Sequence, residues 1–302
     1  MLYDVRQTTT YTYGARVRAA RQVLRLTLVD RASHQHVIAQ ALTTRPEPTE
    51  MEQGLDFFGN ALSWVAFDVP HDRLDISTRC RIAVHPAPLP DPARTAPVEA
   101  VRRQAFASTD LGPLSPVHGL YPSRLIPLDA LITDWVGQSC VDGRPMLEAA
   151  LEVMHRVHED FAYTPGATDV TTLPSEAFTA RRGVCQDFAH VMICGLRGLG
   201  LPARYVSGYL RTVPPPGQER LAGADATHAW VEVWCGDEVG WIGLDPTNAM
   251  PAGADHIVLA VGRDYADVAP VDGVIVTSAD HGLDVRVDVI PLEDTQVQPT
   301  AV

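Results

Sequence analysis

Two patterns of hydrophobic and polar residues divide the chain near residue 100. Before that point, apolar and polar residues alternate in several short runs, including VLRLTLVD, HVIAQALTT and LDISTRCRIAV. Alternation with a period of two, rich in β-branched residues, predicts strands that bury one face. The proline-rich run at 86–97, PAPLPDPARTAP, breaks any regular element and indicates a linker. We therefore expect residues 1–100 to form an N-terminal all-β domain.

Helical spacing appears in the second half of the chain. Apolar residues recur every three or four positions between Met146 and His158, which predicts a helix with one buried face. A second helix is predicted from Val184 to Leu199, and Gly200 with Pro202 just beyond marks its end. Apolar residues surround most of this second helix, so we expect it inside the domain and not on its surface.

Strands follow the second helix and indicate how this domain is built. The runs ARYVSGYL, HAWVEVWC and GWIGLDP each have the composition of a strand. A buried helix packed on an antiparallel sheet is an α+β arrangement. We assign residues 101–145 to a connecting segment, and residues 146–302 to this core together with C-terminal strands such as DVRVDVIPL.

Composition and charge argue against several classes of function. The chain has 24 basic and 37 acidic residues, and its formal charge of −13 disfavours a non-specific grip on nucleic acid or anionic lipid. No apolar run approaches the ~18 residues of a membrane-spanning helix, and the N-terminus lacks the apolar segment of a secretory signal. Five scattered cysteines without a CxxC pair fit neither a disulfide framework nor a zinc ribbon. These features predict a cytoplasmic protein with no membrane or nucleic-acid partner.

Cys185 falls in the first turn of the second predicted helix, and this position matters chemically. The positive end of a helix dipole stabilises a thiolate. The free backbone N–H groups of the same turn can stabilise an oxyanion. Many cysteines are simply small buried core residues, so placement alone does not establish catalysis.

Two further residues strengthen the catalytic interpretation. His228 begins the strand HAWVEVWC, and Asp245 ends the strand GWIGLD. If the turn at 235–240 joins these strands as antiparallel neighbours, the two side chains lie together, and the carboxylate can orient the imidazole. Each residue has an ordinary alternative, since such a histidine is often a surface residue and Asp before Pro often begins a turn. Together with Cys185 they predict a catalytic triad.

A metal centre is the main chemical alternative to a triad. Because each helical residue advances about 100°, Cys185, His190 and Cys194 point to different faces of their helix and cannot share one ion. Neither the GxSxG turn of serine hydrolases nor a glycine-rich phosphate loop occurs in the sequence. We therefore expect no metal and no cofactor.

Four runs of residues resemble the bacterial transglutaminase-like superfamily. They are GVCQDFAH (183–190), LGLPARYVSGYL (199–210), ATHAWVEVW (226–234) and GWIGLDPTN (240–248). The first hundred residues resemble the region that often precedes this core, and HIVLAVGRDYADVAPVDG (256–273) resembles the region that follows it. By position, the resemblance makes Cys185, His228 and Asp245 the catalytic triad. Relatives take a second oxyanion donor from an upstream segment, where Tyr163 is the candidate.

The resemblance implies a papain-like transglutaminase core and a cysteine-dependent enzyme. The expected chemistry is acyl transfer through a thioester on a peptide or carboxamide substrate, as a peptidase or amidase or as a transglutaminase. A peptide or protein substrate is the expected partner. The alternatives are a non-catalytic peptide-binding or scaffolding module that retains the fold, and a zinc-dependent protein that uses scattered Cys and His residues.

Overall fold

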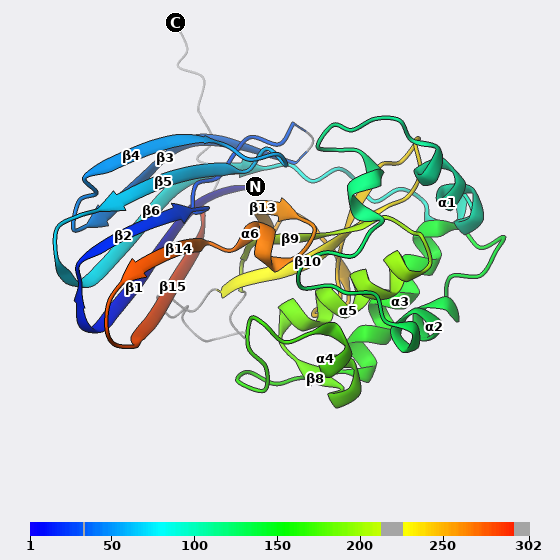
Figure 1. Ribbon diagram of the computed structural model, residues 1–302. Coiled ribbons are helices and arrows are strands. Elements are labelled where there is room, and N and C mark those ends of the chain that lie inside the picture. Colours follow the sequence, from blue (N-terminus) through cyan, green and yellow to red (C-terminus); the bar gives the residue numbers. More distant parts are fainter. Residues whose placement is uncertain (33, 213–225, 293–302) are drawn as a thin grey trace, which may run out of the picture.

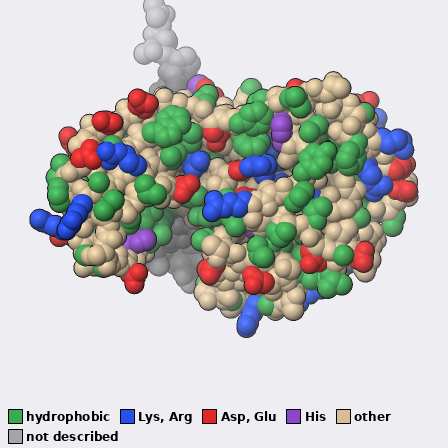
Figure 2. All heavy atoms as spheres, in the orientation of Figure 1, with side chains coloured by type: hydrophobic (Ala, Val, Ile, Leu, Met, Phe, Trp, Pro, Cys, Tyr) green, Lys and Arg blue, Asp and Glu red, His purple; other side chains and the backbone are tan. Residues whose placement is uncertain are grey.

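The computed structural model describes residues 1–32, 34–212 and 226–292. A strand-rich region and a region of helices packed on a sheet lie side by side, with the N-terminus near their junction (Figure 1). On the face drawn in Figure 2, acidic and basic side chains are interspersed, so no single sign of charge dominates this face. Among the described residues, no helix has the length and apolar character needed to cross a membrane.

The strand-rich region consists of two four-stranded sheets, in which every pairing is antiparallel. Its strands are β1 (Leu2–Val17), β2 (Ala19–Leu24), β3 (Gln35–Arg45), β4 (Glu50–Leu55), β5 (Ala61–Phe67), β6 (His71–Val84), β14 (Val271–Val276) and β15 (His281–Leu292). The sheet orders are β15-β1-β6-β3 and β14-β2-β5-β4. Residues such as Leu24, Phe67 and Ile76 from both sheets meet in one apolar core. This confirms the prediction of a strand-rich N-terminal region, because the alternating residues do bury one face.

The last two strands differ from the expectation that they continue the core. All of β15 pairs with β1, from Leu292 opposite Leu2 to His281 opposite Tyr13, and β14 pairs with β2. Period-two patterning identifies a strand but does not name its partner, and here the partners lie more than 240 residues away. Strands β14 and β15 therefore complete the two sheets that the N-terminal strands begin.

The second region is the α+β core, and it confirms the predicted fold class. Its five-stranded antiparallel sheet has the order β12-β11-β10-β9-β13. These strands are β9 (Ala203–Leu210), β10 (Ala226–Trp234), β11 (Trp241–Asp245), β12 (Met250–Pro251) and β13 (His256–Gly262). The helix α5 (Cys185–Gly198) packs on β10 and β9, and 12 of its 14 residues are buried, as the sequence pattern predicts.

Shorter elements surround α5 in the same core. They are α1 (Val98–Ala107), α2 (Ala130–Gly137), α3 (Met146–Asp160), α4 (Pro174–Ala180), α6 (Tyr265–Val268), β7 (Ala162–Tyr163) and β8 (Arg182–Gly183), with short 3₁₀ turns at Pro92–Arg94 and Pro116–Gly119. The segment 101–145 is more than the expected connection, since Val101 of α1 and Val136 of α2 are fully buried in the main core. Frequent prolines interrupt the hydrophobic periodicity of this segment, so the sequence pattern did not predict its two short helices.

A shared apolar cluster joins the two regions. Tyr3 and Val289 from the strand-rich side pack with Tyr209 of β9 and Ile257 of β13. The Tyr209 hydroxyl also donates to the side chain of Gln7 at 2.6 Å. One face of the core sheet is therefore covered by the strand-rich region, and the opposite face is covered by α5.

Gly208 lies on β9 between β10 and β13, and alanine at this position should destabilise the fold. A Cβ atom there would lie 2.1 Å from the carbonyl oxygen of Ile257 and 2.6 Å from the Trp230 ring. Because backbone must move to make room, we expect Gly208→Ala to lower the free energy of unfolding by about 1–3 kcal/mol or more.

Thermal unfolding measures this effect. Gly282→Ala is the matched control, since the nearest neighbour of its added Cβ is the Thr12 carbonyl oxygen, 4.0 Å away. Equal unfolding midpoints for the two variants would contradict the tight packing around Gly208.

Candidate active site

Cys185 is the first residue of α5, as predicted. It is half-buried, whereas the other four cysteines are buried. Asp187 fixes the start of the helix, because its carboxylate accepts the Val184 N–H at 2.8 Å and the Thr168 hydroxyl at 2.7 Å. Gly183 makes this close approach possible, since a Cβ there would lie 2.5 Å from the Asp187 carboxylate. The sulfur is therefore placed at the positive end of a well-anchored helix.

Burial raises the pKa of Asp187 above its ordinary value, while the Thr168 and Val184 hydrogen bonds act in the opposite direction. These contacts occupy the carboxylate with the helix start. Asp187 is therefore a structural group of the site and not a partner of His228.

His228 and Asp245 lie together for the reason given by the sequence. Strands β10 and β11 pair as antiparallel neighbours, with Trp234 opposite Trp241 and Val231 opposite Leu244. The start of β10 therefore lies beside the end of β11. His228 Nε2 is 2.7 Å from Asp245 Oδ2.

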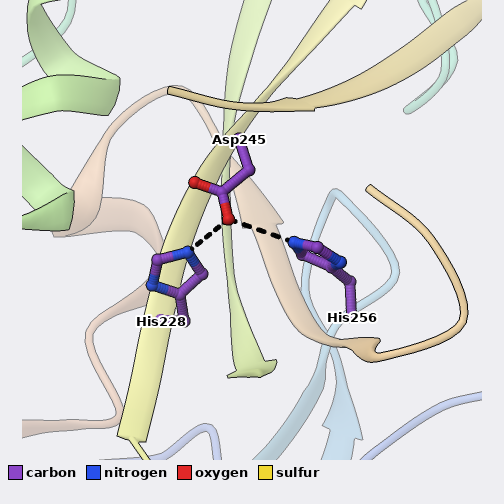
Figure 3. A group of neighbouring side chains, drawn as sticks. All are labelled: His228, Asp245 and His256. Atoms are coloured by element: carbon purple, nitrogen blue, oxygen red, sulfur yellow. Dashed lines mark hydrogen bonds and ion pairs between the residues drawn. The ribbon is translucent and has the colours of Figure 1, made fainter. Parts of the chain in front are cut away.

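Asp245 accepts more hydrogen bonds than the triad alone requires. Its Oδ1 accepts the N–H groups of Thr247 and Asn248 at 2.9 and 3.1 Å. Its Oδ2 accepts the Asn248 side-chain amide at 2.7 Å, and it also lies 3.1 Å from Nε2 of His256. Figure 3 shows this oxygen between the rings of His228 and His256. The carboxylate is fully buried, so these donors replace water around it.

The electrostatics favour an ion pair between Asp245 and His228. Burial alone would lower the pKa of His228, but the hydrogen bond to Asp245 and the interaction with Cys185 raise it to about 10. Burial alone would raise the pKa of Asp245, but its bonds to His228 and His256 hold it well below its usual value. The raised pKa favours the protonated imidazole at neutral pH. Because Nε2 faces Asp245, the other ring nitrogen, Nδ1, is the one available to Cys185.

Tyr163 lies beside the nucleophile on the upstream segment. Its strand β7 runs parallel to β8, with Tyr163 opposite Gly183, two residues before Cys185. Partial burial and the neighbouring Cys185 raise the pKa of the Tyr163 phenol. Tyr163 is 55% exposed.

The alternative metal site on α5, formed by Cys185, His190 and Cys194, is not supported by the contacts of these side chains. His190 Nε2 accepts the backbone N–H of Tyr265 at 3.3 Å, and the Cys194 thiol lies 3.3 Å from the Pro127 carbonyl oxygen. Both side chains are buried, and both contact elements other than the Cys185 site. These contacts agree with the helical geometry, which points the three side chains to different faces of α5.

In the part of the chain that the structure describes, one other group of side chains has metal-ligating atoms close together. Nitrogen and oxygen atoms of His228, Asp245 and His256 lie within 4.8 Å of one another. Both Nε2 atoms, however, already face Asp245 Oδ2 at hydrogen-bond distance, and this pairing satisfies all three groups. The contacts of the site fit a proton-transfer network better than a metal centre.

Sequence reasoning identified two of the residues around Asp245 only as parts of motifs. Asn248 belongs to GWIGLDPTN and His256 opens HIVLAVGRDYADVAPVDG. Both motifs stand out in the sequence, but a motif does not say which side chain its residues contact. The structure brings both to the same carboxylate.

Comparisons with known proteins agree with this architecture. The profile of the transglutaminase-like superfamily matches residues 135–246, and that of the bacterial transglutaminase-like N-terminal region matches residues 3–83. A crystal structure of a candidate cysteine protease from Cytophaga hutchinsonii has a TM-score of 0.73 at 21% identity, and it covers 98% of this chain and 92% of that chain. At this level of identity the likeness supports the fold alone.

Relatives in sequence extend the comparison. An uncharacterized protein of Mycobacterium tuberculosis is 39% identical over 267 residues, 86% of this chain and 83% of that protein. One of Mycobacterium leprae is 30% identical over 287 residues, 94% of this chain and 96% of that protein. A protein-glutamine gamma-glutamyltransferase of Pseudomonas aeruginosa is 35% identical over 135 residues, 44% of this chain and 19% of that protein. Since profiles match both regions and the two mycobacterial relatives align along most of its length, the chain belongs to the transglutaminase-like superfamily.

Proposed function

We propose that this protein is a cysteine-dependent enzyme that transfers an acyl group through a thioester on Cys185. The observation that carries the proposal is the arrangement of His228, whose ring is bound to buried Asp245 on one side and interacts with Cys185 on the other. A half-buried cysteine at a helix start, next to a histidine that a carboxylate orients, is the arrangement of an activated nucleophile. The substrate class we propose is a peptide or a carboxamide.

The proposed reaction has two steps. The Cys185 sulfur attacks the substrate carbonyl carbon, and His228 Nδ1 delivers its proton to the leaving amine as the C–N bond breaks. The Cys185 backbone N–H and the Tyr163 hydroxyl stabilise the oxyanion that forms in between. Water or an amine then attacks the thioester, gives up a proton to His228 and releases the free thiolate.

Lysine side chains of this sequence do not compete as acceptors in the second step. All 24 basic residues counted as Lys or Arg are arginines, so the sequence offers no lysine side chain as an acceptor. The amine of Met1 donates to the carbonyl oxygen of Val84. Hydrolysis and transfer to an external amine are thus the two outcomes, and labelling by an added amine has no competing lysine on the enzyme itself.

Alkylation by iodoacetamide, followed at each cysteine by mass spectrometry, tests whether Cys185 is activated. A cysteine with no ionising partner is about 0.3% thiolate at pH 6, because its pKa is about 8.5. We expect Cys185 to react at pH 6 far faster than the buried cysteines. In His228→Ala, this rate should fall at least about tenfold, because the counter-charge of the thiolate is lost.

The same experiment contains the control and the contrary outcome. Exposure alone also favours Cys185 over buried thiols, so the comparison between wild type and His228→Ala decides. Equal alkylation rates in the two proteins would contradict a thiolate–imidazolium pair between Cys185 and His228. They would favour a non-catalytic peptide-binding module that retains the fold.

A further inference from the structure

His256 is a buried histidine that reaches the site from a strand other than those of His228 and Asp245. It begins β13, and its motif has no role in the proposed reaction. Its Nε2 lies 3.1 Å from Asp245 Oδ2, the oxygen that His228 Nε2 contacts at 2.7 Å (Figure 3). Two histidines therefore share one carboxylate oxygen, and only one of them faces Cys185.

The second ring nitrogen of His256 identifies its tautomer. The backbone N–H of Gly253 lies 3.1 Å from Nδ1, and a backbone N–H can only donate. Nδ1 therefore carries a lone pair, and the single ring proton of this neutral imidazole is on Nε2. The contact with Asp245 is then a hydrogen bond from Nε2–H to Oδ2. A proton on both ring nitrogens of His256 would break the hydrogen bond from the Gly253 N–H, which is costly because the ring is fully buried.

The neighbours of His256 hold the ring in this orientation. The Trp230 ring meets it nearly edge-on, with centroids 5.2 Å apart and planes at 78°. The backbone carbonyl of His256 accepts a hydrogen bond from His34 Nε2 at 2.9 Å, a contact from the strand-rich region. The position of His256 is therefore set by both regions of the molecule.

A buried carboxylate needs such donors to remain charged and fixed in direction. If Oδ2 lost the His256 donor, the anion would lose part of the shell that replaces water. We infer that His256 is a positioning residue, a neutral histidine whose Nε2–H fixes Asp245 Oδ2 toward His228. This inference rests on the proposed function, because positioning matters only if His228 and Cys185 form the reactive pair.

Two substitutions separate the two contacts of His256. The side-chain amide of glutamine reaches the position of Nε2, where it can donate to Asp245. The shorter side chain of asparagine reaches only the position of Nδ1, where it can accept from Gly253 but cannot donate to Asp245. We expect His256→Asn to lower the rate of Cys185 alkylation at pH 6 by about tenfold or more. His256→Gln should recover most of that rate, because the donor to Asp245 is restored. A structural role alone predicts no such preference for glutamine.

Controls separate reactivity from folding. His71→Asn replaces a buried histidine of the strand-rich region, and we expect it to change the thermal midpoint but not the alkylation rate. A wild-type rate in His256→Asn, or equally slow rates in both His256 variants, would overturn the inference. If wild-type Cys185 itself is unreactive and His228→Ala changes nothing, the proposed function fails instead.

NMR tests the hydrogen bond directly in the wild-type protein, so the inference stays testable even if a variant fails to fold. Long-range ¹H–¹⁵N spectra distinguish the two neutral tautomers of histidine from the doubly protonated ring. At neutral pH we expect His256 to be neutral with its proton on Nε2, while His228 is doubly protonated. A doubly protonated His256, or a proton on its Nδ1, would overturn the inference. Loss of the signal in His256→Gln assigns it.

Discussion

Replacing Cys185 by alanine is expected to remove acyl-transfer activity, with a loss on the order of 10⁶-fold. The reason is chemical, because no other group at the site can form the thioester. His228 has no sulfur to form a thioester, and its Nε2 is bound to Asp245. Binding and oxyanion contacts that survive the substitution should leave only a small residual rate over water.

Ammonia release from a glutamine-containing peptide measures both fates of the thioester, and incorporation of a labelled amine measures transfer alone. The matched control is Cys194→Ala, which removes a buried thiol from the same helix. We expect this control to reduce stability modestly and to keep activity. Equal activity in Cys185→Ala and the wild type would exclude the thioester mechanism.

The elements of the site that could be predicted from the sequence are those set by local rules. Gly200 and Pro202 mark the end of α5, and the position of Cys185 follows from where that helix begins. The contact of His228 with Asp245 follows from one hairpin, because a tight turn between antiparallel strands fixes which ends meet. Their roles in catalysis remain predictions, which the experiments on Cys185 test.

The parts that sequence reasoning missed depend on long-range contacts. His256 reaches Asp245 only because the chain between β11 and β13 crosses the end of the sheet. The partner of β15 is likewise set by packing against β1, between 268 residues (Tyr13 opposite His281) and 290 residues (Leu2 opposite Leu292) away, and no local pattern encodes it. Local periodicity thus predicted the elements, while their partners came from the packing of the whole chain.

Replacing Asp245 by asparagine is the second large effect we expect, a loss of about 10³-fold in kcat. The loss should be smaller than the roughly 10⁴-fold seen when a serine triad loses its carboxylate, because a thiol ionises more readily than a hydroxyl. An amide keeps the shape but cannot accept from His228 and His256 as an anion does. Burial lowers the pKa of His228, and without the hydrogen bond and charge of Asp245 to oppose it the raised pKa should fall.

The same substitution predicts how stability depends on pH. The pKa of His228 is raised from 6.5 to about 10 in the folded protein, so its contribution is complete below about pH 6.5 and is lost as the pH rises toward 10. The pKa of Asp245 is lowered from 3.8, so its contribution is present above about pH 4 and is lost at lower pH. Urea unfolding of the wild type and Asp245→Asn should therefore differ most between about pH 4 and 6.5. A difference that grows from pH 7 to pH 9 would contradict an ion pair at the centre of the site.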